Sequence, residues 1–370
     1  MHVKTLGALF FIPVLLWAQV EQTELEKRMQ DILRAAESSS LTAQLFLGFQ
    51  YMSKDGPETC EFLIKRGYLS YRRSITKSLS GRITPDITVD REGDGLGDVE
   101  MRLKYCYLEY KAPGFGIFSD PSLLFGEVFT PWIEFEEKIN LYRMQSPHFL
   151  DRTKIFSSAD FGVTVTSLLG GKVDTEYQKN VNAGYPGKYG SLAAGIYNGG
   201  GYHALEMNRN KTLQWRFTLR PLPEALTGLQ FSYMGAYGRG NLESSPRWQT
   251  HAGFVSYESR KAVLTAQYFR GIGDHLGELS DAAAMPFRNR GYSAFVDWRI
   301  VHGRFSLIGR HDVFQVDKPA GTVTSDRWIG GLAWHIIGRN KILFNFDHVS
   351  YTPSAKPSST VFEMTVELVY

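Results

Sequence analysis

The sequence predicts an all-β protein: a transmembrane antiparallel β-barrel of about sixteen strands with an inward-folded long third extracellular loop and a short N-terminal helix. Three observations lead to this fold class. The chain begins with an apolar leader, its apolar residues recur at every second position from residue 41 onward, and its last strand ends in an aromatic residue. We divide the chain into a leader (1–18), a short periplasmic helix or tail (19–40) and the barrel (41–370).

Residues 1–18 have the pattern of a cleavable signal peptide. Lys4 gives a cationic start, the apolar run 6–16 is too short to span a bilayer, and Ala18 is a small residue suited to cleavage. A buried N-terminal helix is the alternative, but such a helix rarely lacks a polar face. In 19–40, apolar residues at positions 25, 29, 32 and 36 form one narrow stripe, which fits either a docking helix or a frayed tail.

The composition limits the classes of partner. The chain has 41 Lys and Arg against 38 Asp and Glu, and this near balance argues against a nucleic-acid partner. No segment after residue 18 approaches the roughly 18 consecutive apolar residues of a membrane helix. Cys60 and Cys106 fall in separate predicted strands, so we expect two free thiols and neither a disulfide framework nor a cysteine zinc site.

Alternation of apolar and polar residues defines the strands. In 211–220, Leu213 and Phe217 share one face while Thr212 and Arg216 share the other, so one face suits lipid and the other water. The facing of residues 60–72 and 248–258 stays open, because apolar and polar residues do not separate there. The predicted strands lie near residues 42–52, 60–72, 79–90, 99–110, 122–129, 161–171, 189–198, 211–220, 228–237, 248–258, 262–270, 290–299, 304–315, 327–336, 341–351 and 361–370.

The connections support a barrel with short periplasmic turns and longer outer loops. Working back from the C-terminus, the short segments "IIGRNK", "VHGR" and "SRKA" alternate with longer polar ones such as "VDKPAGTVTSD" (316–326). One segment, 172–188, is long where the alternation expects a short turn. The last strand places Phe362 and Tyr370 on one face and Glu363 and Glu367 on the other. Outward tryptophans that would form interfacial girdles are Trp215, Trp298, Trp328 and Trp334.

A barrel of about sixteen strands is too wide for side chains to fill, so we expect an aqueous channel. Both signs of charge recur on the predicted inward faces, where they would meet water instead of lipid. The basic residues predicted to line the pore are Arg82, Arg102, Lys104, Arg216, Arg220 and Arg310.

The segment 130–154 interrupts the alternation with a helical period. Thr130 can cap a helix, Pro131 suits its first turn, and Phe135, Ile139 and Tyr142 form one apolar stripe. Because such a stripe needs a surface to pack on, we expect this loop to fold against the inner wall and narrow the channel. A cap on the outer rim is the alternative. The charged residues of the predicted constriction are Glu134, Glu137, Lys138, Arg143, Arg152 and Lys154.

Signatures of catalysis are missing from this pattern. Nucleophile-elbow, zinc-helix and phosphate-loop motifs are absent, and His311 and Asp312 point to opposite faces of their strand, so we expect no enzyme activity and no cofactor. A weak calcium candidate follows the first part of a calcium loop but has Met101 at its twelfth position, and a solvated acidic turn is the alternative. Its acidic residues are Asp90, Glu92, Asp94 and Asp98.

Segments along the whole barrel, residues 41–370, carry a family resemblance: "IKRGYLSY", "SGRITPDITVD", "LKYCYLEY", "LFGEVFTPWIEFEEKINLYRMQSPHFLDR", "SADFGV", "GIYNGGGY" and "LRPLPEALTGLQFSY". They resemble the phosphate-selective porin O and P family of Gram-negative outer membranes. The resemblance implies a homotrimeric, sixteen-stranded barrel in contact with outer-membrane lipid, whose best-known relatives bind phosphate or polyphosphate. We expect passive diffusion of small hydrophilic solutes, including phosphate or other small anions. The alternative is a barrel with a closed channel that serves as an adhesin or surface enzyme.

Overall fold

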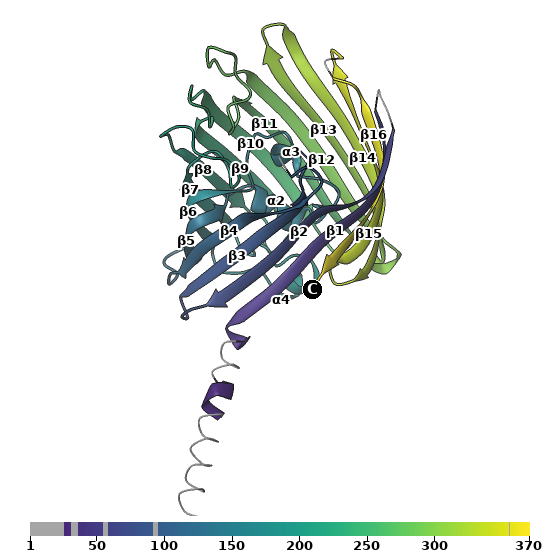
Figure 1. The fold of residues 1–370 in the computed structure, drawn as a ribbon. Helices are drawn as coiled ribbons and strands as arrows, with labels where there is room; N and C mark the ends of the chain where they lie inside the picture. Colours follow the sequence, from purple (N-terminus) through teal and green to yellow (C-terminus); the bar gives the residue numbers. More distant parts are fainter. Residues whose placement is uncertain (1–25, 31–35, 55–57, 92–94, 355) are drawn as a thin grey trace, which may run out of the picture.

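The computed structural model describes residues 26–30, 36–54, 58–91, 95–354 and 356–370, and there sixteen antiparallel strands form one closed barrel. Each strand pairs with its neighbours in sequence, and β1 closes the barrel against β16 from Gln44↔Val369 to Lys54↔Ser359. The predicted all-β fold, an antiparallel barrel of sixteen strands, is confirmed. β1 begins and β16 ends at the same end of the barrel, here called the terminal end; the opposite end is the loop end (Figure 1).

The strands agree with the predicted ones apart from their ends. The largest difference lies at 316–326, which is not a long loop: two strands continue until Lys318 pairs with Gly321. The β-branched residues of this polar segment suit strands, and Pro319 and Ala320 form the turn. The strands are β1 (Ser39–Lys54), β2 (Thr59–Ser74), β3 (Leu79–Val89), β4 (Val99–Lys111), β5 (Phe118–Phe129), β6 (Ala159–Leu169), β7 (Gly190–Tyr197), β8 (Thr212–Leu219), β9 (Leu229–Arg239), β10 (Arg247–Glu258), β11 (Ala262–Ile272), β12 (Arg288–Ile300), β13 (Phe305–Lys318), β14 (Gly321–Ile337), β15 (Asn340–Thr352) and β16 (Ser359–Val369).

The N-terminal predictions are covered in part. The predicted leader, 1–18, lies outside the described residues, and in 19–40 residues 26–30 are helical. Among the described residues, no helix has the length and apolar character needed to cross a membrane.

The outer face of the barrel is apolar, as the alternation predicted. On β8, Phe217 points outward and is 47% exposed, whereas Arg216 points inward and is buried. An apolar surface that continues around a protein is unfavourable in water and suits a lipid environment. Three of the four predicted girdle tryptophans are exposed on it and Trp215 is half-buried; the exposed ones are Trp298, Trp328 and Trp334.

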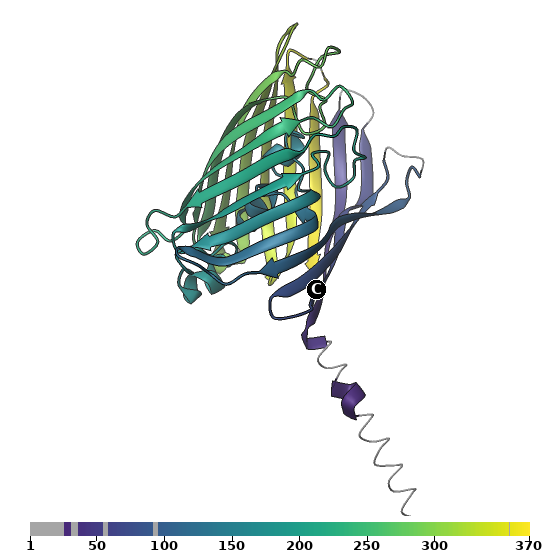
Figure 2. The same cartoon turned by 90° about the vertical axis from the view of Figure 1, so that its left-hand side faces the viewer.

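The connection between β5 and β6, residues 130–158, lies inside the barrel and carries α2 (Ile133–Ile139) and α3 (Phe149–Arg152) (Figures 1 and 2). Its aromatic side chains pack on the inner faces of β10 and β11, with ring centroids 5.1 Å apart for Trp132 and Phe254 and 5.6 Å apart for Phe149 and Phe269. Each fully buried side chain of this size contributes about 1.5–3 kcal/mol, so hydrophobic burial holds the loop on this wall. We call residues 130–158 the inner loop.

The long connection at the terminal end, 170–189, contains α4 (Thr175–Asn180) and closes part of the barrel from below. Asn182 Nδ2 donates to the Lys138 carbonyl at 2.9 Å and to Glu258 Oε2 at 2.6 Å, and the Tyr185 hydroxyl donates to Glu134. This segment is long because it supports α2 of the inner loop, which explains the one exception to the predicted alternation of connections.

Two β-bulges turn extra cations inward. In β2, Phe46 pairs with Arg66 and Leu47 with Ile64, so Lys65 is the inserted residue. In β4, Lys104 is inserted in the same way between the partners of Thr84 and Pro85. A bulge places two consecutive residues on one face of a strand. The ambiguous facing of 60–72 has this cause.

Candidate pore constriction

The inner loop is tied together where it leaves and re-enters the wall. Thr130 Oγ1 donates to the Ser157 carbonyl at 2.7 Å, and the Thr130 backbone N–H donates to Ser158. The prediction that Thr130 caps the helix is wrong, because its hydroxyl closes the loop and α2 begins after Trp132. Trp132 Nε1 donates to Glu136 Oε2 at 3.0 Å within the buried face of α2.

The predicted apolar stripe of the loop is buried. Phe135, Ile139 and Tyr142 all belong to the cluster that the loop forms with the inner wall, and the Tyr142 ring lies tilted against Phe295 with centroids 5.9 Å apart. The opposite side of the loop carries charge. Burial of the apolar side therefore orients the charged side toward β1–β4.

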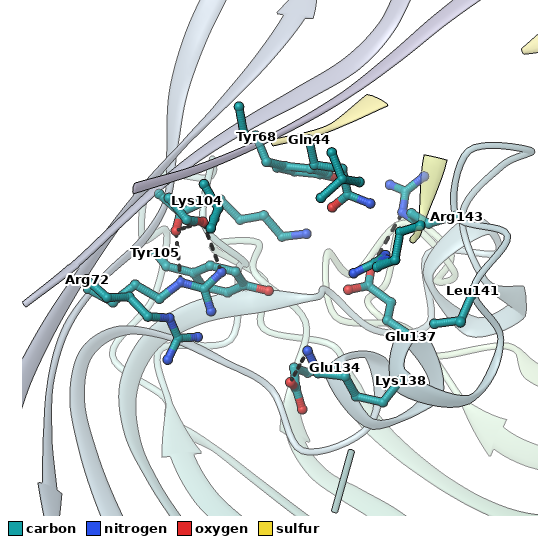
Figure 3. Close-up of a pocket in the computed structure, with 17 residues that line it drawn as sticks. Gln44, Tyr68, Arg72, Lys104, Tyr105, Glu134, Glu137, Lys138, Leu141 and Arg143 are labelled. Atoms are coloured by element: carbon teal, nitrogen blue, oxygen red, sulfur yellow. Dashed lines mark hydrogen bonds and ion pairs between the residues drawn. The ribbon is translucent and has the colours of Figure 1, made fainter. Parts of the chain in front are cut away.

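A cavity of about 310 Å³ lies between this charged side and the inner faces of β1–β4 (Figure 3). Lys104 and Arg72 come from the strand wall, and Glu137 and Arg143 face them from the loop. Basic residues outnumber acidic ones in its lining. The charged lining residues are Arg72, Arg82, Lys104, Lys138, Arg143 and Arg339 with Glu134 and Glu137.

The loop charges in the cavity are paired with one another. Arg143 Nε lies 3.5 Å from Glu137 Oε1, and Lys138 Nζ lies 3.4 Å from Glu134 Oε1. Burial opposes ionisation of Glu137, but the nearby Lys104 and Arg143 cations outweigh it and hold the Glu137 pKa below its ordinary value. The loop face is therefore close to neutral.

The strand charges in the cavity are not paired with acids. Within the described part of the chain, none of Arg72, Arg82 and Lys104 has a carboxylate within ion-pair distance. Arg82 donates to Thr84 Oγ1 at 2.9 Å and lies 4.4 Å from the centre of the Tyr105 ring. Lys104 Nζ lies 4.6 Å and 5.4 Å from the Tyr68 and Tyr105 rings. Aromatic faces attract these cations without neutralising them.

The structure separates the predicted constriction residues into two groups. Glu134, Glu137, Lys138 and Arg143 line the cavity together with Arg82 and Lys104. Arg152 instead pairs with Asp312 of β13 and donates to Ser146 Oγ at 2.9 Å, so it faces away from the cavity.

The remaining predicted residues lie elsewhere. Lys154 is exposed at the loop end, 3.3 Å from Glu278, and Arg102 lies 4.0 Å from Glu100. The prediction that Arg216, Arg220 and Arg310 line an open pore is wrong. Arg216 and Arg310 point inward but are buried under the inner loop, where they donate to the Pro131 and Pro147 carbonyls, and Arg220 donates to Gly187 and Thr227 at the terminal end. Alternation gives the direction of a side chain and cannot show what covers it.

Sequence reasoning missed Lys65, Arg66 and Arg72 on β2, all of which face inward. Lys65 Nζ lies 2.7 Å from Glu363 Oε1 and donates to the Gln145 carbonyl of the inner loop, and Arg66 pairs with Asp86. The sequence did contain a signal for them, namely the adjacent cations Lys65 and Arg66. In a regular strand one of the two side chains would point into lipid, at a cost of about 2–4 kcal/mol at the membrane centre. That cost predicts the bulge.

The inner loop also contains buried titratable groups. Burial raises the pKa of Glu136 to about 7, although Arg310 acts in the opposite direction, and burial lowers the pKa of His148 to about 3. His148 is therefore neutral near pH 7, whereas Glu136 exchanges its proton in that range.

The weaker candidates bring no further groups together. Asp90 Oδ2 accepts from the Gly95 backbone at 3.2 Å, Glu92 and Asp94 lie outside the described residues, and no group of three potential metal-ligating side chains occurs in the part described. His311 stacks on the outward Trp328 with ring centroids 3.8 Å apart, whereas Asp312 is inside with Arg310.

No family model matches the sequence, and a search of curated proteins finds no match. Solved structures do match the fold. The anion-selective porin from Comamonas acidovorans is 10% identical, with a TM-score of 0.61 over 90% of this chain and 99% of that one. The chain has the porin fold. OprB of Pseudomonas putida is 9% identical, with a TM-score of 0.57 over 93% and 96% of the two chains. The outer-membrane channel DcaP of Acinetobacter baumannii is 10% identical, with a TM-score of 0.56 over 89% and 97%.

These similarities extend over nearly the whole barrel but do not distinguish one porin family from another. The resemblance to the phosphate-selective porin O and P family therefore stays a prediction.

Proposed function

We propose that this chain is an outer-membrane porin through which small hydrophilic solutes diffuse passively, with a preference for small anions such as phosphate or organic acids. In this proposal the leader directs export and is removed, the terminal end faces the periplasm, and the inner loop forms the constriction. The apolar outer wall, the barrel closure and the fold similarity support the membrane placement.

One observation carries the preference for anions. Arg72, Arg82 and Lys104 face the cavity without carboxylate partners, while the acids of the inner loop are used by Lys138 and Arg143. Fixed charges in a narrow, low-dielectric passage set the local potential that an ion meets. The net positive potential at this level would raise the local concentration of anions and exclude cations.

The same residues suit phosphate and carboxylate groups. Guanidinium groups donate in a fixed fork that matches both anions, and a lysine adds a point charge. The solved porin from Comamonas acidovorans is described as anion-selective, which accords with this charge pattern in a similar fold.

Planar-bilayer recording tests the proposal. Purified protein should give stepwise conductance increases in potassium chloride, and added phosphate should reduce chloride conductance as it competes for the same cations. Insertion without conductance steps would contradict the porin and favour the closed-channel alternative. Steps that phosphate leaves unchanged would contradict phosphate binding and leave general diffusion.

We further propose that three copies assemble, as the family resemblance implies. OmpT of Vibrio cholerae, 9% identical with a TM-score of 0.55 over 90% of this chain and 100% of that one, is described in a trimer form. Light scattering of the detergent-solubilised protein should give the mass of three chains, and a monomeric mass would contradict this assembly.

A further inference from the structure

A patch of arginines lies on the outer face of the barrel, close to the loop end. Each of its side chains is exposed and alternates along its strand with buried inward residues such as Trp248, Phe269 and Asn289. Its position on the outside separates it from the channel. The arginine patch consists of Arg239 on β9, Arg247 on β10, Arg270 on β11, and Arg288 and Arg290 on β12.

The patch is electrostatically unfavourable in the isolated chain. Arg239 lies directly opposite Arg247 in the strand register, and Arg270 lies directly opposite Arg290. Like charges in directly opposed positions destabilise a sheet. Two such pairs on four consecutive strands therefore destabilise the folded barrel, and packing within the chain gives no reason for them.

The chain offsets part of this charge, since Asp317 lies directly opposite Arg288 in the strand register, Arg239 donates to the Ser245 carbonyl at 3.2 Å and Arg290 donates to Gln315 Oε1 at 2.8 Å. Arg290 NH1 lies 3.0 Å from Asp317 Oδ2, and Arg247 donates to Gln249 at 2.6 Å. Within the described residues, Arg270 and Arg288 have neither an ion pair nor a side-chain hydrogen bond. Their guanidinium groups are left available to an external anion.

The arginines surround a hollow of about 370 Å³. Arg247, Arg270, Arg288 and Arg290 line it, and Asp317 is the acidic residue of its lining. A guanidinium fork donates two parallel hydrogen bonds to a phosphate, and several forks around one hollow can hold a phosphate group from different sides.

The neighbouring outer surface points to a lipid as the source of that phosphate. Tyr268 and Tyr292 pair directly across β11 and β12, two residues farther from the loop end than Arg270 and Arg290, and the apolar Leu264 and Val296 follow along the same strands. Tyrosines concentrate where hydrocarbon meets headgroups. The arginine patch then lies at the level of the headgroups of the outer leaflet.

We propose that the arginine patch binds the phosphate groups of a phosphorylated glycolipid in the outer leaflet. This inference rests on the proposed outer-membrane placement with the loop end outside. The opposed arginine pairs are retained because the lipid phosphates neutralise them, and the tyrosines contact the sugar and acyl boundary of the same molecule.

Binding of bisphosphorylated lipid A in detergent micelles, followed by native mass spectrometry, tests the proposal. The variant Arg270→Gln/Arg288→Gln removes the two arginines without partners and should weaken binding about tenfold or more, because both charge-assisted contacts with the phosphates are lost. The matched control Arg260→Gln/Arg304→Gln changes two exposed arginines at the terminal end and should bind like the unaltered protein.

Two further probes identify the ligand. Lipid A without its phosphates should bind as weakly to the unaltered protein as bisphosphorylated lipid A does to the double variant. Inorganic phosphate at the lipid concentration should not displace the lipid. Equal binding by both variants, equal binding of the dephosphorylated lipid, or displacement by inorganic phosphate would each overturn the proposal. Channel conductance should be the same in the unaltered protein and in both variants. If none of these proteins conducts, that result counts against the proposed porin function and not against the lipid site.

Discussion

The inner wall of the barrel has two parts that differ in what covers them. On β9–β12 the inward residues include Trp248, Phe254 and Phe269, and the inner loop buries them. On β1–β4 the inward residues include Arg82 and Lys104, and these line a cavity. We call these the covered wall and the open wall. The comparison shows that the apolar wall determines where the loop lies, and the place of the loop determines which wall lines a cavity.

The first test removes a packing contact between the inner loop and the covered wall. Replacing the fully buried Trp132 with Ala should cost about 3–5 kcal/mol of loop packing, because aromatic-to-alanine changes leave a cavity in a core. The loop should then leave its wall, with increased conductance and a lower midpoint of thermal unfolding in detergent.

The matched control is Trp298→Ala on the outer face, where the side chain is 57% exposed. It should change neither conductance nor the unfolding midpoint as much as Trp132→Ala. Equal effects of the two variants would show that Trp132 does not hold the loop.

The second test compares the water accessibility of the two walls. In a Cys60→Ser/Cys106→Ser background, which removes the two exposed thiols, Ser70→Cys on the open wall should react rapidly with a charged, water-soluble methanethiosulfonate. Ser256→Cys on the covered wall should stay unreacted, because Ser256 is fully buried. Mass spectrometry of the labelled protein gives both results, and rapid labelling at position 256 would show that water reaches the covered wall.

The third and smallest effect is the pH dependence of loop packing. The Glu136 pKa is raised from 4.5 to about 7 in the folded chain, so the unfolded state loses this proton first as pH rises. Stability should therefore fall from about pH 4.5 to about pH 7, by about 1–3 kcal/mol, and level off above.

The variant Glu136→Gln should remove that part of the pH dependence while it keeps an acceptor for Trp132. Glu243→Gln, at an exposed position, is the control and should retain the pH dependence. The midpoint of thermal unfolding is measured between pH 4.5 and 8 for the unaltered protein and both variants. The same pH dependence of the midpoint in both variants would contradict the assignment to Glu136.

The strands differ in how well alternation predicted their facing. On β8 and β16 polar residues face inward and apolar residues outward, so alternation gave the correct facing of Arg216 and Glu363. On β10 both faces carry large apolar residues, because Phe254 faces the loop and Val255 faces outward. Alternation fails there because the inner loop covers this wall, so apolar residues suit its inward face as well.

The predicted site depended on contacts that no local pattern contains. The helical stripe of the loop correctly indicated which side chains are buried, and Arg143 and Glu137 do lie together in the cavity. Arg152 could not be separated from Arg143 by sequence, because its partner Asp312 lies 160 residues away. The inward turn of Lys104 and Tyr105 together required the bulge in β4.

The reversal potential in a potassium chloride gradient tests the central claim most directly. The unaltered protein should be anion-selective, and Lys104→Gln should shift its potential toward cations because it removes an unpaired charge from the open wall. Lys154→Gln, an exposed loop-end change of the same kind, should leave the potential unchanged. A cation-selective channel, or the same potential in the unaltered protein and Lys104→Gln, would contradict the account.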